Sequence, residues 1–108
     1  MTVTIAQPPR RELHAPATLG LATREAFRQS ANELLDQLAE GNGQLVVDLS
    51  GTKEVDSSGL GALVMVQRHA ADRRLQVVLR SVVPELEFLL VLTKLDDLFL
   101  FEQSRTNR

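Results

Sequence analysis

Hydrophobic residues recur along the chain in two patterns, one with helical spacing and the other as short uninterrupted runs. Between Thr23 and Glu40 the apolar side chains fall three or four positions apart, at Phe27, Ala31, Leu34, Leu35 and Leu38. This spacing predicts an amphipathic helix, for which Thr23 is a suitable N-terminal cap and Gly41 a suitable stop.

Two compact runs rich in valine and leucine predict buried strands. The first is QLVVDL, residues 44–49, bounded by GNG and by Ser50-Gly51, and the second is LQVVLR, residues 75–80. The chain between them predicts a helix from about Ser57 to Arg73, which is far too long for a hairpin. We therefore expect the two strands to be parallel neighbours joined by a right-handed crossover.

The two ends of the chain carry weaker patterns. Residues 2–18 alternate weakly and are interrupted by prolines, so they predict short strands at a sheet edge. Pro84 suits the first turn of a helix that runs through Leu92, and LFLF, residues 98–101, predicts a last short strand. Residues 102–108 are expected to form a loose tail. The alternation predicts an α/β fold, a single domain over residues 1–108 with a mixed, mainly parallel sheet and helices packed against it.

Size and composition narrow the classes of function. A chain of 108 residues with 44% hydrophobic content supports one core, which favours a regulatory or binding module over a large catalytic machine. The charge is balanced at −2, and there is neither a basic tract nor any tyrosine or tryptophan to stack on bases, so nucleic acid is a poor candidate partner. The absence of cysteine excludes disulfides, thiol catalysis and thiolate metal sites.

The same sequence gives an expectation for the cellular compartment. The N-terminus lacks the basic start and apolar centre of a signal peptide, and the longest apolar runs, Ala62–Val66 and Phe88–Leu92, are far shorter than the roughly 20 residues of a membrane span. We expect a cytoplasmic protein without direct membrane insertion.

The stretch EVDSSGLGALVMV, residues 54–66, places two serines where polar sequence turns apolar. Ser57 and Ser58 should lie in the first turn of the second helix, near the carboxyl end of a parallel strand, where open α/β sheets commonly place their sites. Unpaired N–H groups and the helix dipole favour an anion there, so a phosphate on either serine is tolerated. The competing interpretation is purely structural: Asp56 caps the helix, and Gly59 is small to let the helix approach the sheet.

Catalytic and metal-binding interpretations find little support. Ser58 is not in a G-x-S-x-G elbow, and His69, eleven positions along the same helix, lies about 16 Å away, too far to act as its base. His14 lies in the N-terminal segment, where a lone histidine is more often a surface residue. The loop lacks the glycine and lysine order of a phosphate-binding loop, and two histidines without paired carboxylates make a metal site improbable. We expect no enzyme activity and no cofactor.

The remaining charged residues are assigned by default to solvated or capping positions. The acids are scattered over helix, strand and loop, at Glu33, Asp36, Glu40, Asp48, Glu54 and Asp56. Arg68, Arg73 and Arg74 fall toward the polar side and the end of the second helix, where cations complement the helix dipole. Solvation is the default interpretation for them, and a partner-binding face is the alternative.

The order of elements around the serines resembles a known family. The stretch LVVDLSGTKEVDSSGLGALVMVQRHAADRRLQVVLRSVVPELEFLL, residues 45–90, resembles the STAS domain and, within it, the bacterial anti-sigma factor antagonists. The resemblance implies that an anti-sigma factor, which is also a serine kinase, phosphorylates the second serine of the motif, here Ser58. The unmodified antagonist would bind that anti-sigma factor and free the sigma factor, and a phosphatase would reset the switch. The implied partner-binding residues are Asp56, Ser57, Ser58, Gly59 and Leu60.

The N-terminal segment, residues 1–18, matches the family poorly, and one family feature is missing. Members often carry G-x-L-D before the first long helix, whereas this chain has Ala17 for the glycine and Gly20 for the acid. That acid lies, in the family, close to the phosphorylation site. Its absence keeps open a second class, the STAS proteins that are constitutive accessory subunits of lipid-transport ATPase complexes, and a third class of stressosome-type scaffolds.

Overall fold

The computed structural model describes residues 8–103. Five short or medium strands and three helices precede a single helical turn and a last strand, in the order β1 (Arg10–His14), β2 (Thr18–Leu19), α1 (Arg24–Asp36), β3 (Gln44–Asp48), β4 (Glu54–Val55), α2 (Ser57–Asp72), β5 (Gln76–Arg80), α3 (Pro84–Leu92), the 3₁₀ turn η1 (Asp96–Leu98) and β6 (Leu100–Glu102). Among the described residues, no helix is long and apolar enough to cross a bilayer.

The main sheet has four strands in the order β1-β3-β5-β6, and every pair in it is parallel. The two buried strands predicted on either side of the second helix are therefore parallel neighbours, as expected. The N-terminal strand β1 lies at a sheet edge, which is also as expected. A second parallel pair, β2 with β4, stands at the end of the molecule where α2 begins. The predicted α/β domain with a mainly parallel sheet is confirmed, and every strand pair between residues 8 and 103 is parallel.

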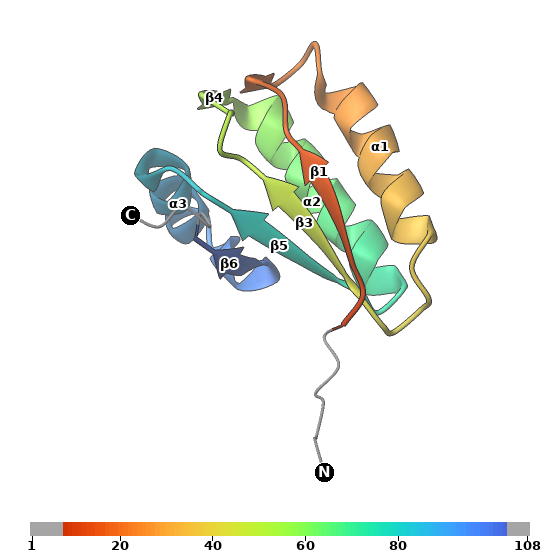
Figure 1. Cartoon of the computed structure of the whole chain (residues 1–108). Helices are drawn as coiled ribbons and strands as arrows, with labels where there is room; N and C mark the ends of the chain where they lie inside the picture. Colours follow the sequence, from red (N-terminus) through yellow and green to blue (C-terminus); the bar gives the residue numbers. More distant parts are fainter. Residues whose placement is uncertain (1–7, 104–108) are drawn as a thin grey trace.

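Helices α1 and α2 lie side by side on one face of the sheet (Figure 1). They bury the alternate strand residues of that face, Leu45 and Val47 on β3 and Val77 and Leu79 on β5. The predicted helical spacing accounts for the side that α1 buries, because Phe27, Ala31 and Leu35 all belong to this core. The shorter helix α3 adds Leu86 and Leu90 to the same core.

The first helix differs from its prediction at both ends. Thr23 is at the cap position, but its hydroxyl makes no capping bond; it accepts a hydrogen bond from Gly20 N and donates one to Thr18 O. At the other end α1 stops at Asp36, four residues before the predicted end. Gly41 does adopt a positive φ of 78°, but in the later turn, where its N–H bonds to Arg73 O. The buried Leu38 lies between these points and continues the apolar spacing without being helical.

The third helix, α3, has its predicted bounds, Pro84–Leu92, whereas the last strand begins later than predicted. Leu98 belongs to η1, so β6 starts at Leu100 and runs to Glu102. Glu102, which was assigned to a loose tail, is thus in the sheet, and its backbone carbonyl accepts a bond from Ser81 N. Residues 104–108 of that tail lie outside the described residues.

Candidate functional site

The start of α2 is held in place by Asp56. This residue has an extended backbone, and its Oδ1 accepts a hydrogen bond from the backbone N–H of Gly59 at 2.9 Å. Its own N–H bonds to Leu19 O at 3.2 Å, which ties the cap to β2. Asp56 therefore caps the helix, and the serines after it are not needed for that task.

Both serines of the motif lie in the first turn of α2. Ser57 is exposed and Ser58 is half-buried. Within residues 8–103 neither hydroxyl makes a hydrogen bond. The backbone N–H groups of Gly59 and Leu60 are already bonded to the side chain and the carbonyl oxygen of Asp56. The helix start therefore presents two hydroxyls toward solvent on a rigid, capped turn.

Gly59 is buried and brings the helix close to β2. A Cβ atom at this position would lie 1.9 Å from the carbonyl oxygen of Leu19, so that only glycine fits. This contact sets the distance between the first turn of α2 and β2. Gly59 thus sets the position of its neighbours, and Leu60, which follows it, is half-buried at the surface.

The carboxylate of Asp56 fills the space beside Gly20. A Cβ atom on Gly20 would lie 2.4 Å from Asp56 Oδ2. An acidic side chain at position 20 would therefore collide with the capping carboxylate and repel it. The carboxylate of Asp56 therefore lies where a side chain at position 20 would begin.

A groove of about 830 Å³ runs from the serines along the outer side of α2. Arg24 and Arg28 of α1 line one side of it, and Arg68 of α2 lies at the end remote from the serines. Its apolar lining includes Leu60 and the exposed side chain of Met65. The serine turn is therefore one end of a longer surface, which the sequence motif alone did not indicate.

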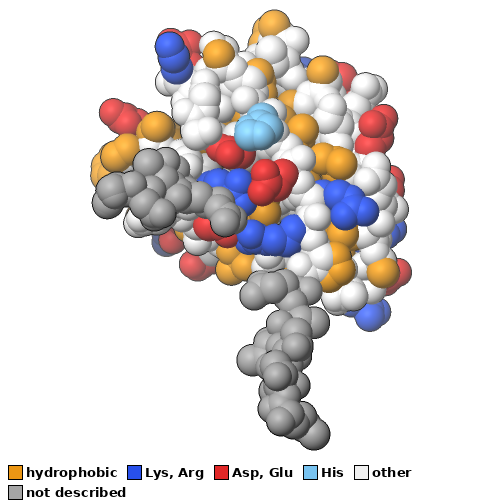
Figure 2. All heavy atoms as spheres, in the orientation of Figure 1, with side chains coloured by type: hydrophobic (Ala, Val, Ile, Leu, Met, Phe, Trp, Pro, Cys, Tyr) orange, Lys and Arg blue, Asp and Glu red, His pale blue; other side chains and the backbone are white. Residues whose placement is uncertain are grey.

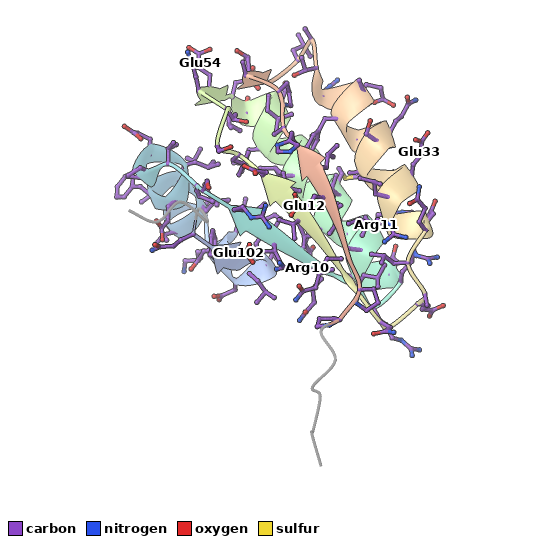
Figure 3. All side chains as sticks on the ribbon, viewed as in Figure 1. Arg10, Arg11, Glu12, Glu33, Glu54 and Glu102 are labelled. Atoms are coloured by element: carbon purple, nitrogen blue, oxygen red, sulfur yellow. The ribbon has the colours of Figure 1, made fainter. Side chains whose placement is uncertain are left out.

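The opposite face of the sheet carries a second polar feature, which the sequence reading missed. Arg80 at the end of β5 is only 5% exposed, and it reaches carboxylates on both neighbouring strands, β3 and β6, and on the edge strand β1 beyond β3. Its Nη2 lies 2.9 Å from Glu12 Oε2, its Nε donates to Glu102 Oε2 at 2.8 Å, and its Nη1 lies 3.6 Å from Asp48 Oδ2. Charged side chains gather in the middle of this face (Figure 2), and Figure 3 shows Glu12 on β1 and Glu102 near β6.

The charges in this network shift one another's ionisation. Contact with Glu12 and then Glu102 raises the pKa of Arg80 above its ordinary value. Hydrogen bonds from Arg10 and Arg80 hold the pKa of Glu102 below its ordinary value. Burial alone would raise the pKa of Asp48, but hydrogen bonds from Ser50, helped by His14 and Arg80, lower it instead. Arg80, Asp48 and Glu102 are therefore charged near neutrality.

Neither histidine is placed to act on the serines. His69 Nε2 lies 2.9 Å from Asp36 Oδ1, at the other end of α2 from the serine turn. His14 Nδ1 lies 3.7 Å from Asp48 Oδ2, on the sheet face that α1 and α2 do not cover. Between residues 8 and 103 no group of three or more His, Cys, Asp or Glu side chains is arranged to hold a metal ion.

Solved structures with the same fold include proteins of bacterial and animal origin. An anti-sigma-factor antagonist (STAS) domain protein from Planctomyces limnophilus superposes with a TM-score of 0.73 at 20% identity, over 87% of this chain and 82% of that one. TM1081 from Thermotoga maritima, assigned as an anti-sigma factor antagonist, gives a TM-score of 0.72 at 20% identity, over 87% and 80%. The murine anion transporter Slc26a9 gives 0.64 at 20% identity, over 84% of this chain and 14% of the transporter.

Sequence comparison covers almost the whole described region. No curated protein matches the chain in sequence. The protein-family model described as "Mlab, STAS domain" matches residues 8–102, which includes every strand and helix described above. This match, together with the shared fold, establishes that the chain belongs to the STAS family.

Proposed function

We propose that this protein is an anti-sigma factor antagonist, a cytoplasmic, non-enzymatic regulator whose binding to its partner is switched by phosphorylation of Ser58. One observation carries the proposal: the hydroxyl of Ser58 stands in the first turn of α2 with no bond to the rest of residues 8–103, because Asp56 already caps the helix. The competing structural interpretation is confirmed for Asp56, which caps the helix, and for Gly59, which lets the helix approach β2, but it assigns no role to this hydroxyl.

The proposed switch is local and electrostatic. A phosphate on Ser58 would add about −1.5 to −2 charges at the positive end of the helix dipole, where an anion stabilises the helix by ~0.3–1 kcal/mol. The same charge in a protein interface has to be desolvated or to face acids of the partner. Since about 1.4 kcal/mol is a tenfold change in affinity, a few kcal/mol of repulsion empties the complex.

The choice between the two serines is tested by kinase reaction. The partner in this proposal is an anti-sigma factor that is also a serine kinase, and any kinase-like gene adjacent to this protein's gene would be the first to test. Incubation with that kinase and ATP should modify the wild-type protein and Ser57→Ala but not Ser58→Ala, as measured by intact mass. Phosphate found on Ser57 would overturn the assignment.

The switch itself is tested by a paired measurement on unmodified, phosphorylated and Ser58→Ala protein. We expect thermal melts followed by circular dichroism to be nearly unchanged by the phosphate, whereas titration calorimetry should show the dissociation constant rising tenfold or more. Unfolding on phosphorylation, or binding that is indifferent to it, contradicts the mechanism. A phosphatase that restores binding would complete the cycle.

A second candidate function is favoured by the contact between Gly20 and Asp56. Because residue 20 is glycine and the carboxylate of Asp56 occupies the space beside it, the surface beside Ser58 lacks the acid expected of a kinase substrate in this family. The second candidate is a constitutive accessory subunit of a lipid-transport ATPase complex. Tight binding to a transport ATPase that is unchanged by phosphorylation, or by Ser58→Asp, would select this function over the switch.

A further inference from the structure

The groove along α2 carries an uneven charge. Three arginines, Arg24, Arg28 and Arg68, line it with a single acid, Glu25. Glu25 is already engaged, since both of its carboxylate oxygens accept hydrogen bonds from Arg28 Nη2, at 3.2 and 3.1 Å. Arg24 and Arg68 are exposed, and neither has an ion-pair partner within residues 8–103. The groove therefore presents unneutralised positive charge although the chain as a whole is slightly acidic, with a net charge of −2.

The middle of the groove is apolar. Met65 is 47% exposed there, and Leu60 and Val64 are half-buried beside it. Gly61 also lines the groove, and nothing lies within 4 Å of where its Cβ would be, so that another chain can come close to the helix backbone. The lining runs from Ser57 to Arg68, which corresponds to roughly 16 Å of helix or about three turns.

We propose that this groove binds an acidic amphipathic helix of the partner protein, with the partner's apolar side chains over Met65 and Leu60 and its carboxylates at Arg24, Arg28 and Arg68. The length of about three turns and the apolar middle flanked by charge are features of helix-in-groove recognition. Arginine suits this role because its planar guanidinium binds carboxylates through two parallel hydrogen bonds. The inference rests on the proposed function in one respect: the partner is the one that contacts the serine turn.

The position of the serines gives this groove a regulatory consequence. Ser57 and Ser58 line the same groove as Arg24 and Arg28. A phosphate on Ser58 would offer these arginines acceptor oxygens within their own chain, and it would compete with the carboxylates of the partner. Phosphorylation would then weaken binding by neutralising the groove as well as by repelling the partner.

The features of the groove favour a protein over a nucleic acid. The side chains of its middle are aliphatic, while single strands bind by stacking on aromatic residues along a continuous basic track. Of the three arginines that line the groove, Arg28 is paired with Glu25, and only Arg24 and Arg68 are not bonded to an acid of the groove. An acidic helix with an apolar stripe would cover the apolar middle of the groove and pair its carboxylates with the two arginines.

The test uses two synthetic peptides and needs no identified partner. Both have roughly 18 residues, long enough for partial helix in water, with leucines at helical spacing. One carries glutamates beside the leucine stripe and the other carries lysines at the same positions. Each is titrated into ¹⁵N-labelled protein and followed by two-dimensional NMR. The acidic peptide should shift the amides of α2 from Gly61 to Arg68 and those of the first turns of α1, and the basic peptide should not.

Variants then assign the charges. The combined Arg24→Gln, Arg28→Gln, Arg68→Gln protein should bind the acidic peptide at least tenfold more weakly, and Ser58→Asp should weaken it in the same direction. Arg74→Asn is the matched control, because Arg74 is exposed beyond the far end of α2 and should change binding less than twofold. Circular dichroism melts check that each variant is folded.

Equal binding of the two peptides, shifts confined to another surface, or tighter binding of a thymidine oligonucleotide than of the acidic peptide at the same residues would each overturn the proposal. The outcomes are separable from those of the proposed function. If neither peptide binds, the groove proposal is overturned, while phosphorylation of Ser58 by the kinase would still support the switch. If the acidic peptide binds but Ser58 is never phosphorylated, only the switch is overturned.

Discussion

The carboxylate of Asp56 accepts the backbone N–H of Gly59 at 2.9 Å, and this one hydrogen bond decides how the serine pair between them can be used. A helix start needs a side-chain acceptor for its first free N–H groups, and either serine could have supplied one. Because Asp56 does so, Ser57 and Ser58 remain chemically free on a rigid turn.

Removal of the cap should therefore cost stability, whereas removal of the first serine should not. We expect Asp56→Ala to lower the free energy of unfolding by about 1 kcal/mol, the usual cost of losing a capping aspartate. Ser57→Ala should change it by less than about 0.3 kcal/mol, because alanine is well tolerated in an exposed first turn. Urea denaturation of both variants measures the difference, and a larger loss for Ser57→Ala would mean that the serine is a structural cap.

The two glycines after the serines should respond in opposite directions to the same substitution. Gly59→Ala places a Cβ 1.9 Å from Leu19 O, so the helix must move away from β2, and we expect a loss of about 3 kcal/mol or more. Gly61→Ala meets nothing within 4 Å and should stabilise α2 by about 0.5–1 kcal/mol. Similar stability changes for the two variants would show that α2 does not approach β2 this closely.

Local patterns predicted the longer strands and the three helices, whereas the two-residue strand β4 and the turn η1 carry no such pattern and were missed. The strands 44–48 and 76–80 and the helix Ser57–Asp72 are found within one residue of their predicted bounds, since apolar runs and turn residues define both ends. The predicted end of α1 was wrong because Leu38 continues the apolar spacing after the helix has ended at Asp36. The spacing of apolar residues indicates which residues are buried, and here the buried residues continue past the end of the helix.

The features of the site that the sequence could not give are those that depend on pairing between distant elements. Asp48 and Arg80 are opposite one another in the β3–β5 register, and Glu12 and Glu102 join them from β1 and β6. The sequence signal for this network was a charged residue at the last or second-last position of each buried run, Asp48 in the first and Arg80 in the second. Likewise the contact between Gly20 and Asp56 joins two loops, and the groove needs the α1 arginines beside α2. The serine motif was visible locally, but its surroundings were not.

The end of α2 offers a stabilising substitution. Arg74 has a positive φ of 58°, and it follows the helix in the position where its N–H bonds to Ala71 O and the next N–H, of Leu75, bonds to Ala70 O. This is the helix ending that glycine favours, because a Cβ strains the left-handed conformation by roughly 1 kcal/mol. We expect Arg74→Gly to raise the unfolding free energy by up to about 1 kcal/mol in urea denaturation. Arg74→Val, which is β-branched and poorly tolerated at positive φ, should lower it.

The last prediction concerns the charged network across the sheet face. Arg80 is the buried cation that contacts three carboxylates at once, so Arg80→Met would remove the arginine nearest Asp48 and one of the two arginines on Glu102, which keeps Arg10. We expect a loss of about 2–4 kcal/mol at pH 7, somewhat less than for a fully buried pair because Glu12 and Glu102 remain partly exposed. Arg11→Met is the control, since Arg11 bonds to Gln37 on the helix side of the sheet, and it should cost under about 0.5 kcal/mol.

The pH dependence of stability separates this network from simple packing. Hydrogen bonds from Arg10 and Arg80 lower the pKa of Glu102 from its ordinary value of 4.5, and the pKa of Asp48 is also lowered, from 3.8. Carboxylates with depressed folded pKa values stabilise the protein fully above their unfolded pKa, and that contribution is lost as the pH falls through the folded pKa. Wild-type stability should therefore decline below about pH 4.5, and Arg80→Met should decline less, so that the two proteins converge in acid. Urea denaturation at a series of pH values measures both curves, and parallel curves would mean that Arg80 acts through packing alone.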